Sequence, residues 1–263
     1  MVMNPTHPQP FVFVPKHGAP RLLFVLLHGE SATPEQLFPL AEAIKHAFPF
    51  AVVVLPYGSV SVQSAPSDDK RAASLGYHWV NPEDLASHNY SSRMYEALPD
   101  LIGQIQQLQI QYDLSGEQTA LAGFSQGASM ALEASLAQPD IAGRVLAFSG
   151  LYASMPDKAA PASLLHFFHG SADQDVPTGQ VEATVVRISE LQGDATLDVA
   201  SAVGHELHRA LIKQAIVRLQ TCVPLRSWEE AITSLQQIAS DKEPLSPPDC
   251  NQSANGTAKR TLH

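Results

Sequence analysis

Short runs of apolar residues alternate along the chain with longer segments of helical periodicity. The apolar runs are rich in Val, Leu and Phe and do not alternate with polar residues, as expected of strands that a parallel sheet buries on both faces. The clearest of these runs cover residues 22–27, 51–55, 119–122, 144–148 and 164–168. Residues 196–201 form a weaker run that we place near a sheet edge, and residues 11–14 fit a leading antiparallel edge strand.

Five further segments carry apolar residues at helical spacing. In residues 34–48, for example, Leu37, Leu40, Ala41 and Ile44 fall on one face. The other four segments cover residues 95–112, 128–136, 179–191 and 207–219. Strands that alternate with helices of this length are typical of βαβ units, so we predict an α/β fold with a doubly wound, mostly parallel sheet.

The pattern predicts one domain, from residue 11 to residue 223, after a flexible N-terminus at residues 1–10. Residues 56–92 form a long loop rich in Gly, Pro, Ser and aromatic residues, and loops of this length often carry function. A C-terminal helix is predicted at residues 224–240. The polar residues 241–263 lack large apolar side chains, so we expect a disordered tail.

Composition and charge exclude several classes of protein. Of the 263 residues, 44% are hydrophobic and 16% charged, which suits a packed core, and the net charge of −10 argues against binding nucleic acid or an anionic membrane. The two cysteines, Cys222 and Cys250, build no disulfide framework, and the first residues do not have the pattern of a secretory signal. We therefore expect a cytoplasmic protein.

The segment Gly123-Phe124-Ser125-Gln126-Gly127 lies between a predicted strand and a predicted helix. Glycines on both sides of the serine permit a sharp strand-to-helix turn, which lifts the hydroxyl above the sheet. Ser125 is therefore a candidate nucleophile. In the simpler interpretation, Ser125 only caps the helix.

A nucleophilic serine needs a histidine base and a carboxylate that orients it. Carboxylates occur at Asp173 and Asp175, in the loop after the strand at 164–168, and histidines occur at His205 and His208, after the strand at 196–201. The order serine, acid, histidine is the one that this type of sheet requires. Gly204 favours His205 over His208, because it permits a tight turn directly after the strand.

The segments GFSQG, HGSADQDVP and GHELH, together with LLHGE near the start, resemble the serine carboxylesterase family of the α/β-hydrolase fold. This family includes phospholipases, carboxylesterases and acyl-protein thioesterases, and the likeness is greatest to its small bacterial cytoplasmic esterases. The resemblance implies Ser125 as nucleophile, Asp173 as the acid and His205 as the base. It also implies short- to medium-chain acyl esters as substrates and no cofactor.

The oxyanion hole is expected to use the backbone N–H of Gln126 and that of Glu30. The family more often has H-G-x-G-D in the second of these loops, whereas this chain has Ser31 and Ala32 in the last two places. The Glu30 carboxylate would oppose an oxyanion unless it points into solvent. This departure bears on substrate preference more than on catalysis.

Two other groups of side chains have competing interpretations. Tyr77, His78 and Trp79 either form a wall of the substrate pocket or anchor the long loop. The spacing of the histidines matches no compact metal site, so we expect none.

The hypothesis is a serine hydrolase that acts on carboxylic or thiol esters of small molecules. A lysophospholipase or lactone hydrolase of the same fold is an alternative, and so is a non-catalytic protein that binds a partner. A homodimer is left open.

Overall fold

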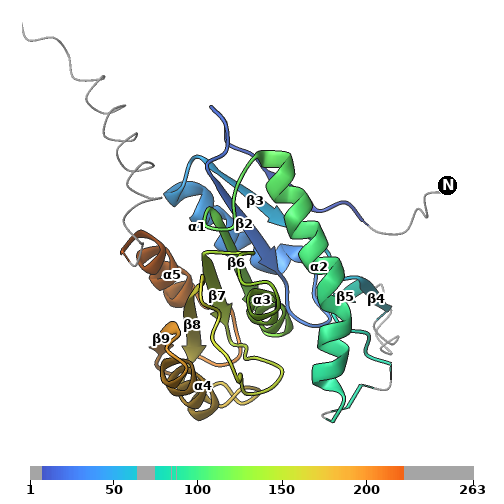
Figure 1. The fold of residues 1–263 in the computed structure, drawn as a ribbon, viewed down its shortest axis with the longest axis vertical. Helices are drawn as coiled ribbons and strands as arrows, with labels where there is room; N and C mark the ends of the chain where they lie inside the picture. The colour runs from blue at the N-terminus through green and yellow to red at the C-terminus, as the bar shows by residue number, and fades with distance from the viewer. Residues whose placement is uncertain (1–7, 64–74, 84, 87, 222–263) are drawn as a thin grey trace, which may run out of the picture. The chain divides into compact units, whose positions relative to one another are not determined.

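A mostly parallel β-sheet forms the centre of the part of the chain that the structure describes. This computed structural model describes residues 8–63, 75–83, 85–86 and 88–221. The strands of the sheet are β1 (Phe11–Phe13), β2 (Leu22–Leu27), β3 (Ala51–Leu55), β6 (Thr119–Phe124), β7 (Arg144–Phe148), β8 (Leu164–Gly170) and β9 (Asp194–Ala200). Their order is β1-β3-β2-β6-β7-β8-β9 (Figure 1), and only β1 runs antiparallel to its neighbour.

Helices cover both faces of the sheet (Figure 1). Side chains of α2, α3 and α4 join one large apolar cluster with alternate strand residues such as Val25 and Phe167. On the other face, α1 and α5 contact each other, and the ring of Phe24 lies 5.6 Å from that of Phe48. The helices are α1 (Phe38–Ala47), α2 (Tyr90–Tyr112), α3 (Gln126–Ala137), α4 (Thr178–Glu190) and α5 (Arg209–Thr221).

This architecture confirms the predicted α/β-hydrolase type of sheet, with differences at the ends of elements. The helix predicted at residues 34–48 is divided into a short 3₁₀ helix, Pro34–Leu37, and α1, which has Pro39 in its first turn. Proline suits a first turn, since its missing N–H would have no partner there. Helix α2 begins at Tyr90 rather than at residue 95.

The long loop predicted at residues 56–92 contains a β-hairpin, so that prediction was wrong in part. Strand β4 (Val60–Gln63) pairs antiparallel with β5 (Leu75–His78). An isolated bridge joins Tyr77 of β5 to Ala32, in the loop after β2. The hairpin therefore brings the end of β5 against the loop after β2, where the sequence predicts the oxyanion donor Glu30.

Several predicted segments lie outside the described residues. They are the first seven residues, the helix at 224–240 and the tail at 241–263. In the described residues, no helix is both long enough and apolar enough to cross a membrane.

The strand order places a topological switch point between β2 and β6. From β2 the chain passes through α1 to β3 on one side, whereas β6 lies on the other side of β2. Loops that leave two such neighbouring strands diverge at their carboxyl ends, where open α/β sheets bind ligands. Glu30 follows β2 and Ser125 follows β6, so both candidates lie at this point.

Candidate active site

Ser125 occupies a strained turn between β6 and α3. Its backbone has φ 52° and ψ −120°, a conformation that L-residues rarely adopt. Three backbone hydrogen bonds hold this turn: Ser125 N–H donates to Phe148 O at 2.9 Å, and the N–H groups of Ala128 and Ser129 donate to Ser125 O at 2.9 and 3.1 Å. Ser125 is partly exposed. The local geometry is that of a nucleophile elbow.

The glycines on both sides of Ser125 permit close backbone contacts. A Cβ atom on Gly123 would collide with the backbone of Gly127, and one on Gly127 would collide with the carbonyl oxygens of Leu27 and His28. Gly127 thus lets α3 approach the end of β2. This approach brings the serine turn and the loop after β2 together.

We expect Gly127→Ala to destabilise the fold by about 3 kcal/mol or more, because backbone atoms of β2 would have to move. Gly103→Ala is the matched control. Gly103 lies within α2, and a Cβ added there would meet no described atom within 4 Å, so alanine should stabilise by about 0.5–1 kcal/mol. Urea unfolding of both variants measures these changes. A Gly127→Ala variant as stable as the wild type would contradict this packing.

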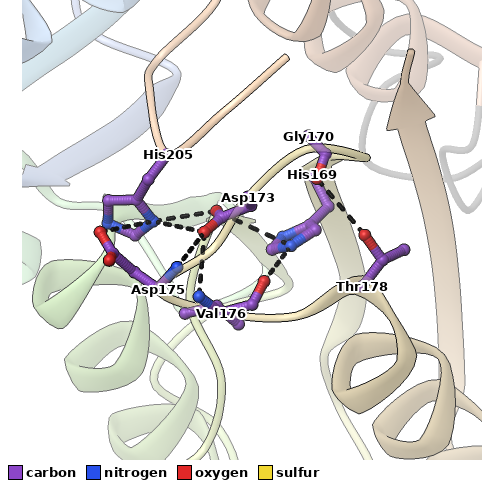
Figure 2. A network of polar contacts seen from close by, with 7 residues as sticks. All are labelled: His169, Gly170, Asp173, Asp175, Val176, Thr178 and His205. Atoms are coloured by element: carbon purple, nitrogen blue, oxygen red, sulfur yellow. Dashed lines mark hydrogen bonds and ion pairs between the residues drawn. The ribbon is translucent and has the colours of Figure 1, made fainter. Parts of the chain in front are cut away.

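Asp173 and His205 meet at the carboxyl ends of β8 and β9, as Figure 2 shows. His205 Nδ1 lies 2.9 Å from Asp173 Oδ2 and 3.1 Å from Oδ1. Since Nδ1 donates its proton to the carboxylate, Nε2 is left as an acceptor. The His205 ring also contacts Phe124, the residue before Ser125, with 4.9 Å between ring centroids.

The structure does not join all the candidate residues by hydrogen bonds. Within the described residues, none links the Ser125 hydroxyl to the His205 ring. Catalytic hydrogen bonds are often long or poorly aligned before substrate binds. The lack of a hydrogen bond here is therefore compatible with the roles expected of Ser125 and His205.

The Asp173 carboxylate is held in its ionised form. Burial acts to raise its pKa, but the hydrogen bonds from Val176 N–H and His205 outweigh burial and set the pKa of Asp173 below its usual value. Asp175 N–H donates to the same carboxylate oxygen as Val176 N–H, at 3.0 and 2.9 Å. The group therefore remains an anion at neutral pH.

The two alternative residues take other positions. Asp175 Oδ2 is 4.0 Å from His205 Nδ1, and its side chain is 73% exposed. Asp175 does not cap the next helix, because the cap position of α4 is Pro177 and no side chain forms a hydrogen bond there. His208 lies just before α5 rather than within it, and its Nδ1 accepts the N–H of Ala210 at 3.2 Å.

His169 is a buried residue of the site to which the sequence analysis assigns no role. Its Nε2 donates to Val176 O at 2.7 Å and lies 3.7 Å from Asp173 Oδ2 (Figure 2). This bond fixes the loop whose Val176 N–H binds Asp173. The sequence signal that could have indicated this role was the motif HGSAD. In this motif His169 is the last but one residue of β8, just before the loop that carries Asp173.

The two expected oxyanion donors lie on opposite sides of the switch point. Gln126 begins α3, and its side-chain Oε1 accepts the N–H of Trp79 at 2.8 Å. In the other loop, Gly29 N–H donates to Gln36 Oε1 at 2.7 Å, and Ser31 has φ 54°. Serine there adopts a conformation that glycine takes without strain. The backbone at Ser31 therefore keeps the conformation that glycine would adopt, although this chain departs from the H-G-x-G-D pattern.

Tyr77 and Trp79 are buried beside these loops. The Trp79 indole N–H donates to His28 O at 2.8 Å, and its ring lies 5.0 Å from that of His28. Their contacts fit the anchoring interpretation, while their role as a pocket wall stays a prediction.

His28 is a structural histidine. Gly58 N–H donates to its Nε2 at 2.9 Å, so the proton lies on Nδ1, which donates to Gly29 O at 2.8 Å. Burial lowers the pKa of His28 to about 4, which keeps the ring neutral. Among the described residues, no group of three or more His, Cys, Asp and Glu side chains could hold a metal ion.

A family model described as Phospholipase/Carboxylesterase matches residues 8–223. The chain belongs to this family. Esterase YpfH of Escherichia coli strain K12 is 31% identical over 211 residues, which make up 80% of this chain and 87% of that protein. These findings confirm the resemblance inferred from the motifs.

Solved structures of carboxylesterases share the fold of this family member. The crystal structure of esterase PE8 is similar with a TM-score of 0.68 and 26% identity, over 81% of this chain and 97% of that one. The carboxylesterase of Bacillus cereus, at 16% identity, shares the fold with a TM-score of 0.63 over 81% of this chain and 93% of its own. The protein is a carboxylesterase-type hydrolase that acts on ester bonds.

Proposed function

We propose that the enzyme hydrolyses short- to medium-chain carboxylic esters through an acyl-enzyme on Ser125. The observation that carries this proposal is the pairing of His205 Nδ1 with the buried Asp173 carboxylate at 2.9 Å, beside the strained turn of Ser125. The thioester is a second substrate class compatible with the same chemistry.

In the first half of the reaction, Ser125 Oγ attacks the ester carbonyl carbon while His205 Nε2 takes the hydroxyl proton. Asp173 stabilises the imidazolium that forms. The negative charge on the carbonyl oxygen is received by the N–H groups of Gln126 and Glu30. His205 then gives its proton to the departing alcohol or thiol, and the acyl group stays on Ser125.

In the second half, a water molecule replaces the leaving group. His205 removes a proton from this water as it attacks the acyl carbon, and the second tetrahedral intermediate collapses to release the acid and the free serine hydroxyl. The His205 side chain is 20% exposed, and the Asp173 side chain is fully buried. This burial favours a short, directional hydrogen bond between the two.

A panel of p-nitrophenyl esters from acetate to laurate, with matching thioesters and a lysophospholipid, tests the proposal. We expect the highest kcat/KM for acyl chains in the short to medium range and much slower turnover of laurate. Ser125→Ala serves as the blank for each substrate. No turnover above this blank for any ester would refute the proposed reaction, and a preference for the lysophospholipid would correct the substrate class.

A further inference from the structure

The loop after β2 contains a second array of serine, histidine and carboxylate. Ser31 Oγ forms a hydrogen bond of 2.9 Å with His78 Nε2. On the other side of the ring, His78 Nδ1 lies 3.4 Å from Glu30 Oε1, an ion-pair distance. The His78 side chain is 5% exposed, and its Nδ1 has no hydrogen-bond partner among the described residues. The Glu30 carboxylate lies beside this nitrogen without forming a hydrogen bond to it.

The strand that carries His78 lies directly against this loop. Tyr77 N–H donates to Ala32 O at 2.9 Å, and a Cβ on Gly76 would come within 2.5 Å of Ser31 O. Ser31 has a positive φ of 54°, which costs a serine free energy unless its surroundings hold it there. The bond from its hydroxyl to His78 is one contact that does so.

The position of Glu30 creates an electrostatic problem for the proposed reaction. Its N–H is the expected second donor to the oxyanion, but its own carboxylate is negative and would oppose that charge. The carboxylate is 52% exposed rather than fully solvated, and it is turned toward His78. A proton on Nδ1 of this imidazole would offset part of its charge.

We infer that His78 is a positioning residue for ester hydrolysis. It holds the Ser31 turn through Nε2 and, with a proton on Nδ1, faces the Glu30 carboxylate, so that the Glu30 N–H meets the oxyanion with less opposing charge. The inference rests on the proposed function, and His78 acts only through Glu30 and Ser31. It also gives the Ser31 hydroxyl a role at a position where the family more often has Gly.

The test is a double-mutant cycle in the full-length enzyme, with p-nitrophenyl butyrate as substrate. His78→Leu removes both ring nitrogens, and Glu30→Gln removes the charge while keeping the backbone N–H. We expect His78→Leu to lower kcat by about 10- to 100-fold with KM changed less than about threefold. In the Glu30→Gln background, the same substitution should lower kcat severalfold less. The exposed His17→Gln is the control and should leave kcat unchanged.

Equal losses in both backgrounds would mean a purely structural role for His78 and would overturn the inference, as would an unchanged kcat. If His78→Leu does not fold, Ser31→Gly replaces it, because glycine adopts the positive φ without strain. Ser31→Gly should lower kcat about 3- to 10-fold in a protein at least as stable as the wild type, and an unchanged kcat would overturn the inference. Absence of Ser125-dependent turnover in the wild type is a separate outcome, which would overturn the proposed function as well.

Discussion

Replacement of Ser125 by alanine is expected to leave a folded protein whose ester turnover is lower by about three orders of magnitude or more. The reason is that no acyl-enzyme can form without Oγ, whereas binding and the backbone donors remain. Stability should change little, since serine and alanine are equally strained at φ 52°. The measurement is kcat/KM with p-nitrophenyl butyrate, together with thermal unfolding of both proteins.

The control for this variant is Ser115→Ala. Ser115 is exposed in the turn before β6, at the opposite end of that strand from Ser125. It should keep the wild-type rate. Near-wild-type turnover by a folded Ser125→Ala enzyme would remove Ser125 from the mechanism.

Substitutions at the two candidate acids, Asp173 and Asp175, should differ strongly in their effect on turnover, and so should those at His205 and His208. We expect Asp173→Asn to lower kcat by about 10³- to 10⁴-fold, because an amide no longer selects the His205 tautomer that accepts the serine proton. Asp175→Asn should cost less than about tenfold, since that carboxylate is exposed and 4.0 Å away.

For the base, His205→Ala should lower kcat by about 10³-fold or more, and His208→Ala should leave it nearly unchanged. The loss of the His208 contact with Ala210 N–H should appear instead as a destabilisation of about 1 kcal/mol or less. Steady-state kinetics and urea unfolding separate the two effects. Greater damage from Asp175→Asn or from His208→Ala would show that the loops were assigned to the wrong residues.

The sheet and the main contact of the site could be predicted because their signals are local. Runs such as residues 22–27 are continuously apolar, and the structure buries them completely in the middle of a parallel sheet. Asp173 and His205 each follow a strand, and parallel neighbours end at one edge, so their meeting follows from the topology.

The environment of Glu30 could not be predicted because it depends on contacts between distant segments. Ser31 and His78 are 47 residues apart, and their meeting depends on the hairpin of β4 and β5, which the sequence presents as a loop. A serine at φ 54° gives no signal of its own, since the preference for glycine at such positions is only statistical. The start of α2 at Tyr90 was missed for a similar reason: the first turn carries polar residues such as Ser91 and Ser92, without the apolar spacing of the later turns.

The measurement that tests the central claim most directly is covalent labelling with a fluorophosphonate, followed by peptide mapping of the modified protein. The account predicts one adduct per chain, on the peptide that contains Ser125, with labelling that is abolished in Ser125→Ala and slowed in Asp173→Asn. An unlabelled protein, or an adduct on another residue such as the exposed Ser31, would contradict the claim that Ser125 is the nucleophile.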